Sequence, residues 1–557
     1  MSSSNSKKLK RFCAGGLPIV RTVIERLGLK KILSKYIPSH DNETIPAVET
    51  LILLIYNLIL GKAPLYELNE WVDGLDKRAL GCEGISGGKF NDDRFGRALD
   101  KLYFADRASL MTEIIVAAID KFGLDLSQVH NDSTTIKAYG SIAGRTRDGL
   151  ELARGHSKDH RPDLKQLVYN MTIAADGAVP IHCHCYPGNR TDDTVHIETW
   201  EKICRLGNGV DFLYVADSKL CTDKQLHYID SHGGRAVTIM PATWNEAKEL
   251  DNRLRTTRLS KKEILRKSRP NSESEIEYFS AYNGEYFTNK RGYRIHLIHS
   301  SEKRKRDRKS RDQRLEKAEH DLADLTCKIN QRNLKTEESI ENAAKAILDK
   351  CDVSGLITLR INTVQQEEEK QIGKGRPGKN TKYWTEYTEY YTLGWSRHLS
   401  VIKKEARTDG TFPLVSTDIN LTAKQVLEAY KYQPRIEKRF CQFKWYHKAA
   451  PLLFKKIERV EANLFAFFLS LIIQALIERE VRGKMKENRI AAIALYPEDR
   501  FAPHPTTTKI LRVFENICRA VLTNEDGSID EFKDDLTEVQ VKILELMEMS
   551  EESFWYA

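Results

Sequence analysis

The chain has 557 residues, with 88 Lys and Arg against 79 Asp and Glu and a formal net charge of +9. This length exceeds what one compact core accommodates, so several structural units or one domain with a large insertion are expected. Hydrophobic residues make up 41% and aromatic residues 9% of the chain, which excludes wholesale disorder. The basic balance is compatible with a polyanionic partner.

The ten cysteines and the apolar runs indicate the cellular compartment. The cysteines have no repeating spacing and form no Cys-x-x-Cys pair, which is typical of reduced intracellular thiols. The basic N-terminal stretch precedes an apolar part that is too short and interrupted for a signal peptide. The most apolar runs, 48–60 and 464–477, are shorter than the roughly 20 residues that span a bilayer. We therefore expect a soluble cytoplasmic protein without membrane contact.

Residues 1–124 are expected to form a helical N-terminal region. Apolar residues recur there at three- and four-residue spacing in four segments: 48–60, 65–72, 92–104 and 110–122. A helical region at the front of a basic chain either binds DNA or caps the domain that follows. The pattern alone favours neither.

The period changes in residues 125–247, where strands and helices are expected to alternate. The turn Asp176-Gly177 suits a tight hairpin between two alternating runs. The expected strands are 128–133, 166–175, 178–186, 212–216 and 236–240, and the expected helices are 192–206 and 223–231. An order of three strands, helix, strand, helix, strand is typical of ribonuclease-H-like nuclease domains.

Two aspartates stand where such a sheet places functional groups. Asp132 follows the first strand in VHNDST, and Asp217 ends the buried strand in FLYVADSK. Side chains just past the carboxyl ends of strands face the functional crevice of an open α/β sheet. The alternative for each is an aspartate that terminates a strand or caps a helix.

A polar helix face is expected in EAYKYQPRIEKRFCQFK. Four residues lie within about one 60° arc of a continuous helix: Tyr430, Gln433, Glu437 and Lys444. Ile436, Phe440 and Phe443 supply an apolar stripe behind them. Pro434 disfavours helix at Gln433, so the helix kinks or begins there. The alternative is a charged, solvated helix face.

In combination these segments resemble bacterial insertion-sequence transposases of the DDE superfamily. The resemblance is to the group marked by Tyr, two residues, Arg, three residues, Glu, six residues and Lys. The residues that match in register are Tyr430, Glu437 and Lys444. Gln433 takes the place of the signature Arg, with Arg435 two positions on. The stretch 155–166 is also similar, and the resemblance extends over about 92–481.

The resemblance implies phosphoryl transfer at DNA 3′ ends, assisted by two Mg²⁺ or Mn²⁺ ions. It implies that Asp132 bridges both ions, while Asp217 and Glu437 each complete one side. Lys444 would lie on a phosphate near the scissile bond, with Tyr430 along the same strand. The implied partners are double-stranded DNA, as terminal inverted repeats and target, and a second copy of the chain. The place of action would be the prokaryotic nucleoid.

Further side chains are expected at the DNA. Gln433 and Arg435 belong to the signature region, and Trp244, Trp384 and Trp395 are candidates for stacking on a flipped base. The alternative for each tryptophan is a core position. A basic stretch beside Asp132 consists of Arg145, Arg147, Arg154, Lys158, His160, Arg161 and Lys165. Of these, Lys158, Arg161 and Lys165 are the expected DNA contacts.

The motif His182-Cys183-His184-Cys185 is typical of metal sites at first sight. On a strand, the two histidines face one side and the two cysteines the other, so neither face offers more than two ligands. A plain sheet strand is the preferred interpretation, with a zinc site as the alternative.

The distance between Asp217 and Glu437 requires an inserted domain. We expect an α/β fold: a ribonuclease-H-like mixed-sheet catalytic core in 125–247 and 411–480, interrupted by an insertion domain in 248–410. Helical regions flank it at 1–124 and 481–557.

The leading hypothesis is a DDE transposase that cleaves transposon-end DNA and joins it to target DNA. The alternatives are a domesticated, non-catalytic DNA-binding protein and a stand-alone ribonuclease-H-like nuclease. The three carboxylates argue against a pure binder. The large insertion and the helical ends favour the transposase over the nuclease, because they provide surfaces for recognising and pairing DNA ends.

Overall fold

The computed structural model describes residues 8–39, 43–61, 63–81, 87–138, 142, 144–146, 148–155, 163–190, 195–207, 209–269, 272–282, 287–446 and 454–556. The chain divides into two compact units. Unit 1 contains Met1–Thr238 and Glu428–Ala557, and unit 2 contains Ile239–Leu427. Unit 1 is therefore built from two separated parts of the chain.

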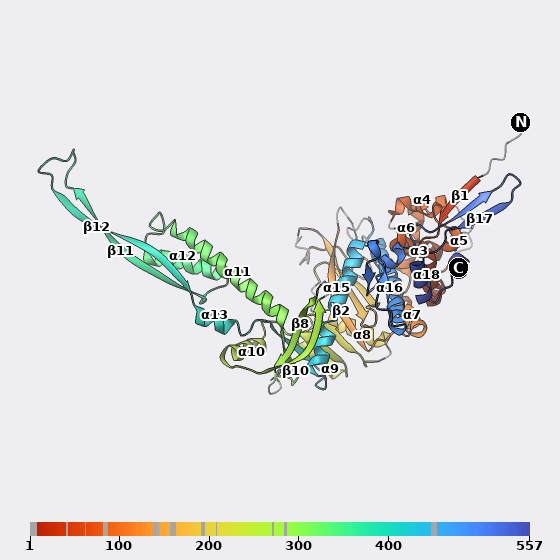
Figure 1. The fold of residues 1–557 in the computed structure, drawn as a ribbon, viewed down its shortest axis with the longest axis horizontal. Helices are drawn as coiled ribbons and strands as arrows, with labels where there is room; N and C mark the ends of the chain where they lie inside the picture. The colour runs from red at the N-terminus through yellow and green to blue at the C-terminus, as the bar shows by residue number, and fades with distance from the viewer. Residues whose placement is uncertain are drawn as a thin grey trace. The chain divides into compact units, whose positions relative to one another are not determined.

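A mixed sheet runs through unit 1 (Figure 1). Its strand order is β4 (Pro180–Pro187), β3 (Gln166–Ala174), β2 (Gln128–Lys137), β5 (Leu213–Ala216) and β6 (Arg235–Ile239). Strands β2, β3 and β4 are antiparallel, whereas β5 is parallel to β2 and β6 is parallel to β5. Helices α8 (His196–Leu206) and α9 (Asp223–Ser231) make the crossovers. The element order predicted for this segment is confirmed.

Strand β2 is longer than expected. The sequence predicts that the first strand stops at residue 133, but β2 continues to Lys137 because it pairs with β3 as far as Lys137↔Gln166. Asp132 therefore lies in the middle of β2, not just after the end of a strand. Polar residues fill this second half of β2, yet most of them are buried, so composition gave no sign of the continuation.

The N-terminal helices pack on one long helix of the C-terminal part. They are α1 (Leu17–Leu27), α2 (Leu29–Tyr36), α3 (Ala47–Tyr56), α4 (Leu68–Asp73), α5 (Lys77–Leu80), α6 (Asp92–Phe104) and α7 (Arg107–Phe122), with η1 (Asn57–Gly61), η2 (Leu65–Glu67) and η3 (Gly87–Lys89) between them. Helix α16 (Ile457–Glu487) contacts α1, α3 and α6. The N-terminal helices are therefore part of the packed interior of unit 1.

Helix α16 is long and apolar enough to cross a bilayer, which corrects the expectation that its apolar run is too short. However, 89% of its most apolar window is buried inside the protein. In this window the helix carries apolar residues on all of its faces, which is typical of a helix buried in a core.

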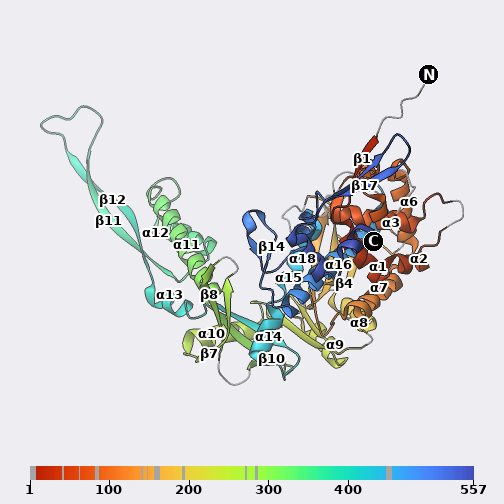
Figure 2. The same cartoon turned by 45° about the vertical axis from the view of Figure 1, so that its right-hand side comes forward.

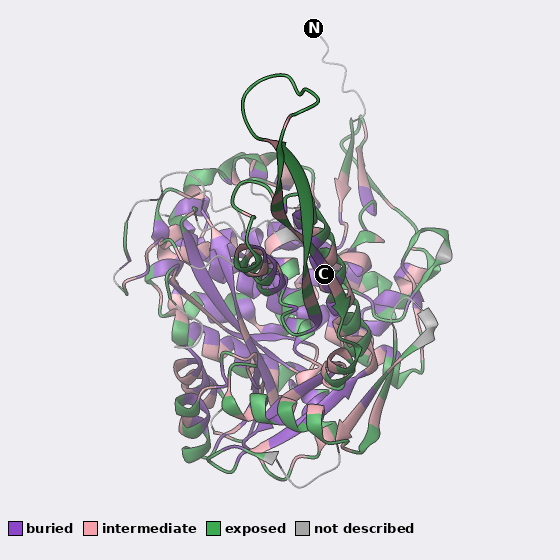
Figure 3. Cartoon of the chain, turned by 90° about the vertical axis from the view of Figure 1, so that its left-hand side faces the viewer, coloured by how far each residue is buried: buried purple, intermediate pink, exposed green. Residues whose placement is uncertain are grey.

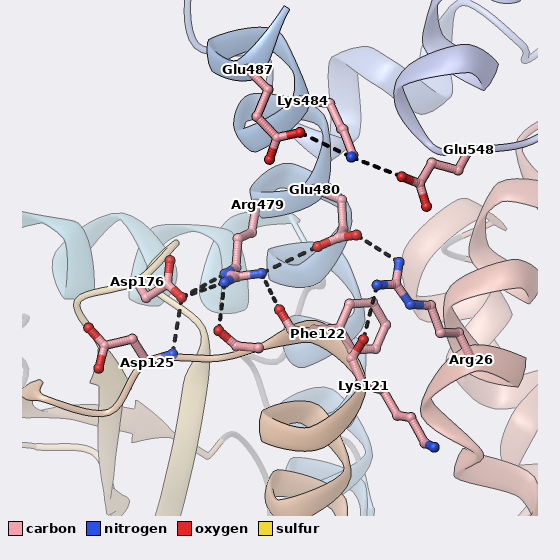
Figure 4. Close-up of polar contacts among 11 residues, drawn as sticks. Arg26, Lys121, Phe122, Asp125, Asp176, Arg479, Glu480, Lys484, Glu487 and Glu548 are labelled. Atoms are coloured by element: carbon pink, nitrogen blue, oxygen red, sulfur yellow. Dashed lines mark hydrogen bonds and ion pairs between the residues drawn. The ribbon is translucent and has the colours of Figure 1, made fainter.

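Ion pairs join α16 to the sheet and to the N-terminal helices (Figure 4). Arg479 donates to the Asp176 carboxylate, at 2.8 Å from Nε, and to the carbonyls of Phe122 and Gly123. Glu480 accepts from Arg26 at 2.7 Å. The turn between β3 and β4 is thereby held to the end of α7. Gly177 in that turn has φ of 74°, and an added Cβ would lie 2.9 Å from the Arg479 side chain.

The C-terminal region contains strands as well as helices. Strand β1 (Lys8–Cys13) pairs with β16 (Cys518–Thr523), which pairs with β17 (Ile529–Lys533). The remaining elements are β14 (Ile493–Ala494), η6 (Pro497–Asp499), β15 (Phe501–Ala502), α17 (Thr507–Arg512), α18 (Glu538–Leu546) and α19 (Glu551–Tyr556). The prediction of a purely helical end is wrong at β16 and β17: β16 pairs with β1 from the other end of the chain, and β17 pairs with β16.

Unit 2 combines an antiparallel sheet with helices and a long two-stranded ribbon (Figure 2). The sheet holds β7 (Lys261–Arg269), β8 (Ser272–Tyr282), β9 (Phe287–Thr288), β10 (Arg294–Ser300) and β13 (Thr411–Ser416). The helices are α10 (Asn245–Thr256), α11 (Ser301–Thr326), α12 (Glu337–Lys350) and α13 (Leu399–Glu405). Strands β11 (Ile357–Gln371) and β12 (Tyr383–Arg397) form the ribbon. Because β13 pairs with β10, unit 2 extends beyond residue 410.

Candidate functional site

The two aspartates lie side by side at one end of parallel strands. The last paired residues of β2 and β5 are Asn131 and Ala216. Asp132 and Asp217 are the next residues of each strand, so they stand at the same level of the sheet on the same face. Neighbouring strands are about 4.8 Å apart, which brings the two carboxyl groups close together. The fold thus unites two carboxylates that are 85 positions apart in the sequence.

Short local contacts hold both aspartates. The Asp132 Oδ1 atom accepts a hydrogen bond from the Ser133 amide at 2.7 Å, and Asp217 Oδ1 accepts from the Lys219 amide at 3.0 Å. The Thr238 hydroxyl of β6 donates to the backbone carbonyl of Asp217 at 2.6 Å. The end of β5 is therefore fixed by its neighbouring strand. Both residues are only partly buried.

The third carboxylate comes from a short helix that begins at a proline. Helix α14 (Ala423–Tyr430) ends at Tyr430, and α15 (Pro434–Cys441) begins at Pro434, as the sequence suggests. Proline lacks an amide hydrogen and tolerates the first turn of a helix, where that hydrogen has no partner. Glu437 lies in this first turn and is exposed. The apolar stripe predicted behind it is confirmed, since Ile436, Phe440 and Phe443 are all buried.

Tyr430 brings the three carboxylates together electrostatically. Burial, followed by the negative charges of Asp217, Glu437 and Asp132 in that order, raises the pKa of the Tyr430 phenol to about 12. Each of these side chains comes from a different element of unit 1, and all three act on one hydroxyl group. The phenol stays protonated at neutral pH, so it is a hydrogen-bond donor at the site.

The donor chemistry of the site fits a hard divalent cation. Carboxylate oxygens are the ligands that Mg²⁺ prefers, and it keeps several waters, so few protein ligands suffice. Asp132 and Asp217 supply such oxygens from adjacent strands. Among the described residues, no three His, Cys, Asp or Glu side chains are grouped closely enough to hold one metal ion. Glu437 is exposed, and exposed side chains change rotamer within nanoseconds.

Gln433 fastens the start of α15 to the strand that carries Asp132. Its Nε2 atom donates to the Asn131 carbonyl at 2.9 Å. Its Oε1 atom lies 2.9 Å from His130 Nδ1, so this nitrogen carries the proton and donates to the amide. His130 Nε2 then accepts from Gln128 Nε2 at 2.8 Å. The chain of amide, imidazole and amide spans the interior immediately before Asp132.

This burial does not fit the expectation that Gln433 contacts DNA. Only 7% of the residue is exposed, and both atoms of its amide group are used inside the protein. The expected single face for Tyr430, Gln433, Glu437 and Lys444 is also wrong. A turn separates α14 from α15, and the π-helical turn η5 (Gln442–Tyr446) changes the residue spacing before Lys444. One angular step per residue does not hold across these breaks.

We expect the stability of unit 1 to fall on acidification through His130. Burial lowers the pKa of His130 to about 4, and the hydrogen bond to Gln433 opposes this shift. In the unfolded chain the pKa is near 6.5, so the neutral form stabilises the folded state above that pH. This contribution, about 3 kcal/mol, is lost as the pH falls through the folded pKa.

Urea unfolding at pH 7 and pH 4 measures this effect. When the pH is lowered from 7 to 4, the free energy of unfolding should fall less in His130→Gln than in the wild type. His227→Gln, at an exposed histidine of α9, is the control and should follow the wild type. Equal pH slopes for all three proteins would contradict the assignment of His130.

The other residues predicted to contact DNA differ in their exposure to solvent. Arg435 is exposed, with its guanidinium over the Tyr432 ring at 5.9 Å. Lys165 is exposed, and its carbonyl accepts from the Ala138 amide just after β2. Lys444 is half-buried in η5. Arg147, Lys158, His160 and Arg161 lie outside the described residues.

The tryptophans proposed for base stacking lie in unit 2. Trp244 is half-buried directly before α10, and Trp384 is exposed on β12. Trp395 packs against the hydrophobic cluster of α11 and α12, which is the core alternative. The three residues therefore differ in their availability to a ligand.

The motif 182–185 lies on strand β4, which pairs with β3 as predicted. The environments of its residues alternate. The carboxylate of Glu198 acts on His184, whereas that of Glu461 acts on Cys183 and Cys185. Burial lowers the pKa of His184 to about 4 and raises the pKa of Cys183 to about 12. Both groups are therefore neutral at pH 7.

Sequence reasoning missed the residues that position the site. His130 and Gln433 were not paired with each other, and Arg439 was not noticed. Arg439 is buried; it donates to the carbonyls of Ala178 and Gly177 at 3.0 Å and forms an ion pair with Glu478. One feature of the sequence could have indicated this pairing: His130 directly follows the apolar Val129 in a strand that is expected to be buried. Buried polar groups need partners from neighbouring elements.

Comparisons with known proteins give one family model and a set of solved structures. A family model described as a domain of unknown function, DUF4277, matches residues 12–116, which is roughly a fifth of the chain and covers the N-terminal helices. No protein of curated function matches this chain. Among solved structures, the chain is similar to the piggyBac transposase synaptic complex with hairpin DNA, determined by cryo-EM. The identity is 8%, the match covers 82% of this chain and 81% of that chain, and the TM-score is 0.27.

Proposed function

We propose that this protein is a DDE-type transposase that cleaves DNA at the ends of its element and joins them to target DNA. The proposal rests on one observation: Asp132, Asp217 and Glu437 come from two strands and a facing helix, and all three act on the Tyr430 hydroxyl. A binding protein gains nothing from three carboxylates in a DNA site, because they repel phosphates.

The residues of the site have distinct roles in this proposal. Asp132 and Asp217 would hold Mg²⁺ at the sheet, and Glu437 would complete the ligand set from α15. When bound, the ions supply activation of a water or 3′-hydroxyl and stabilise the leaving oxygen. The neutral Tyr430 phenol donates a hydrogen bond to a carboxylate or to a non-bridging phosphate oxygen. Gln433 keeps α15 against β2, and thereby keeps Glu437 opposite Asp132.

Removal of the metal tests this proposal. The purified full chain is incubated with a plasmid that carries the DNA flanking its own gene on both sides. We expect cleavage at the flank boundaries in Mg²⁺ or Mn²⁺, no cleavage in excess EDTA, and recovery when Mg²⁺ is added back. Ca²⁺ serves as the control, because it should support DNA binding without cleavage.

The same experiment separates the two alternative functions. Cleavage that ignores the flanking sequence would indicate a stand-alone nuclease. Specific binding without cleavage in any divalent cation would indicate a domesticated DNA-binding protein. Cleavage that persists in excess EDTA would contradict metal-assisted chemistry at the three carboxylates.

A further inference from the structure

The ribbon of unit 2 consists of β11, the loop 372–382 and β12. Its two strands pair continuously from Ile357↔Arg397 to Gln371↔Tyr383, over 15 residues each. At about 3.3 Å per residue, the ribbon is about 50 Å long. Among the described residues, its sheet has just these two strands. Both outer edges therefore present backbone groups that another chain can pair with.

Only the base of the ribbon is covered by its own unit. One face there packs against the cluster of α11 and α12 through Leu359, Ile361, Tyr391, Leu393 and Trp395. Farther along the same face, Tyr387 is 61% exposed, and on the opposite face Trp384 is 49% exposed. Figure 3 shows this outer part of the ribbon as exposed. The other exposed apolar side chains here are Val364, Ile372 and Tyr383.

An isolated two-stranded ribbon is marginally stable in water, and exposed apolar residues that gather on one element mark an interaction surface. Five large apolar side chains in so short a segment exceed the scattered single residues that are normal on a surface. The outer ribbon thus has the composition of an element that is covered by a partner.

Charge is separated along the ribbon. The basic tip, within the loop 372–382, carries four cations and no acidic residue: Lys374, Arg376, Lys379 and Lys382. The strand segments 364–371 and 383–390 carry one cation, Lys370, and an acidic band of five carboxylates: Glu367, Glu368, Glu369, Glu386 and Glu389. Lys370 is paired with Glu386. The tip therefore has a charge of +4 and the strands beside it have −4.

We propose that the outer ribbon is the surface through which two copies of this chain associate. Two ribbons that lie antiparallel bring the basic tip of each against the acidic band of the other. The exposed rings of Tyr383 and Tyr387, which share one face of the ribbon, are then buried between them. DNA is the less suitable occupant, because the acidic band would lie along a phosphate backbone that repels it. This inference is independent of the chemistry at Asp132, Asp217 and Glu437.

A charge exchange between the two patches tests the proposal. In the tip variant, Lys374, Arg376 and Lys379 are changed to Glu; in the band variant, Glu367, Glu368 and Glu369 are changed to Lys. All six side chains are exposed. Sedimentation velocity is measured on the full chain without DNA or Mg²⁺, over a concentration series and at low and high salt. We expect each variant alone to self-associate at least tenfold more weakly than the wild type, because like charges then meet.

An equimolar mixture of the two variants should recover wild-type association, since opposite charges face each other again. The control changes three exposed lysines elsewhere in unit 2 to Glu, namely Lys317, Lys328 and Lys335, and should associate as the wild type does. Circular dichroism and urea unfolding establish that each variant is folded.

Three results would overturn the proposal: a monomeric wild type at every concentration, a tip variant that associates normally, or a mixture no stronger than its parts. A tip variant that loses DNA affinity but keeps self-association would identify DNA as the occupant. Because these measurements contain no metal and no DNA, their failure leaves the proposed cleavage reaction untouched.

Discussion

Asp217→Asn is expected to reduce DNA cleavage at the element ends by about 10³-fold or more. The substitution keeps the shape of the side chain and removes the charge that would hold a divalent ion. Metal ions contribute several kcal/mol to transition-state stabilisation, and a loss of about 4 kcal/mol corresponds to a factor of about 10³. Asp132→Asn and Glu437→Gln should behave alike, because the three carboxylates act together.

Binding and folding should survive the change at Asp217. Fluorescence anisotropy in Ca²⁺ should show DNA affinity no weaker than that of the wild type, because one negative charge near phosphate is lost. Asp211→Asn is the matched control, since Asp211 is exposed directly before the other end of β5, where it pairs with Arg235. Its cleavage rate should equal that of the wild type. Full activity in Asp217→Asn would refute the assignment of the site.

Arg439→Met is expected to lower the free energy of unfolding of unit 1 by about 3–5 kcal/mol. Arg439 and Glu478 are both about 94% buried and lie 3.0 Å apart. Removing one partner of a buried ion pair costs about this amount, and Glu478 then keeps only the longer ion pair with the less buried Arg482 at 3.4 Å. The carbonyls of Gly177 and Ala178 also lose their donor. The loss is measured by urea unfolding at pH 7.

A second substitution separates the charge effect from the packing effect. Glu478→Gln in the Arg439→Met background removes the negative charge of the buried carboxylate. The remaining side-chain oxygen still accepts from the Thr507 amide. The double variant should recover part of the lost stability. Arg205→Met, at an exposed arginine paired with Glu201 at 3.8 Å, should stay within about 0.5 kcal/mol of the wild type. A similarly small change in Arg439→Met would contradict a structural role for the buried pair.

Local periodicity predicted the elements of the sheet well. Helices α6 and α9 have the predicted bounds, and the hairpin of β3 and β4 turns at Asp176-Gly177. These segments succeed because one face of each is apolar, so burial and sequence pattern coincide. Strand β16, on which β17 pairs in turn, was missed because its other partner is β1, some 500 positions away. No window of local sequence contains that partner.

The carboxylates of the candidate site could be predicted from the sequence, but the residues that hold them in position could not. Asp217 stands just past the end of its strand, the position that a fold-level rule selects, whereas Asp132 lies within β2 beside it. Glu437 follows a spaced signature. The role of Gln433 could not be predicted, because glutamine occurs both at DNA-binding surfaces and in buried hydrogen bonds such as the one with His130. Its contact with His130 joins elements about 300 residues apart. That position of the signature is therefore occupied here by a residue that fixes a helix.

The division of unit 1 into two chain segments has a consequence for synthesis on the ribosome. Domains generally fold as units in the order in which they emerge. Unit 2 is continuous, so it is complete once Leu427 has been made, whereas α15 and α16 follow it. A nascent chain thus carries Asp132 and Asp217 throughout the translation of unit 2 while Glu437 does not yet exist. On the proposed function, chains that end before Glu437 cannot cut DNA, and nuclease activity begins only after α15 has been made.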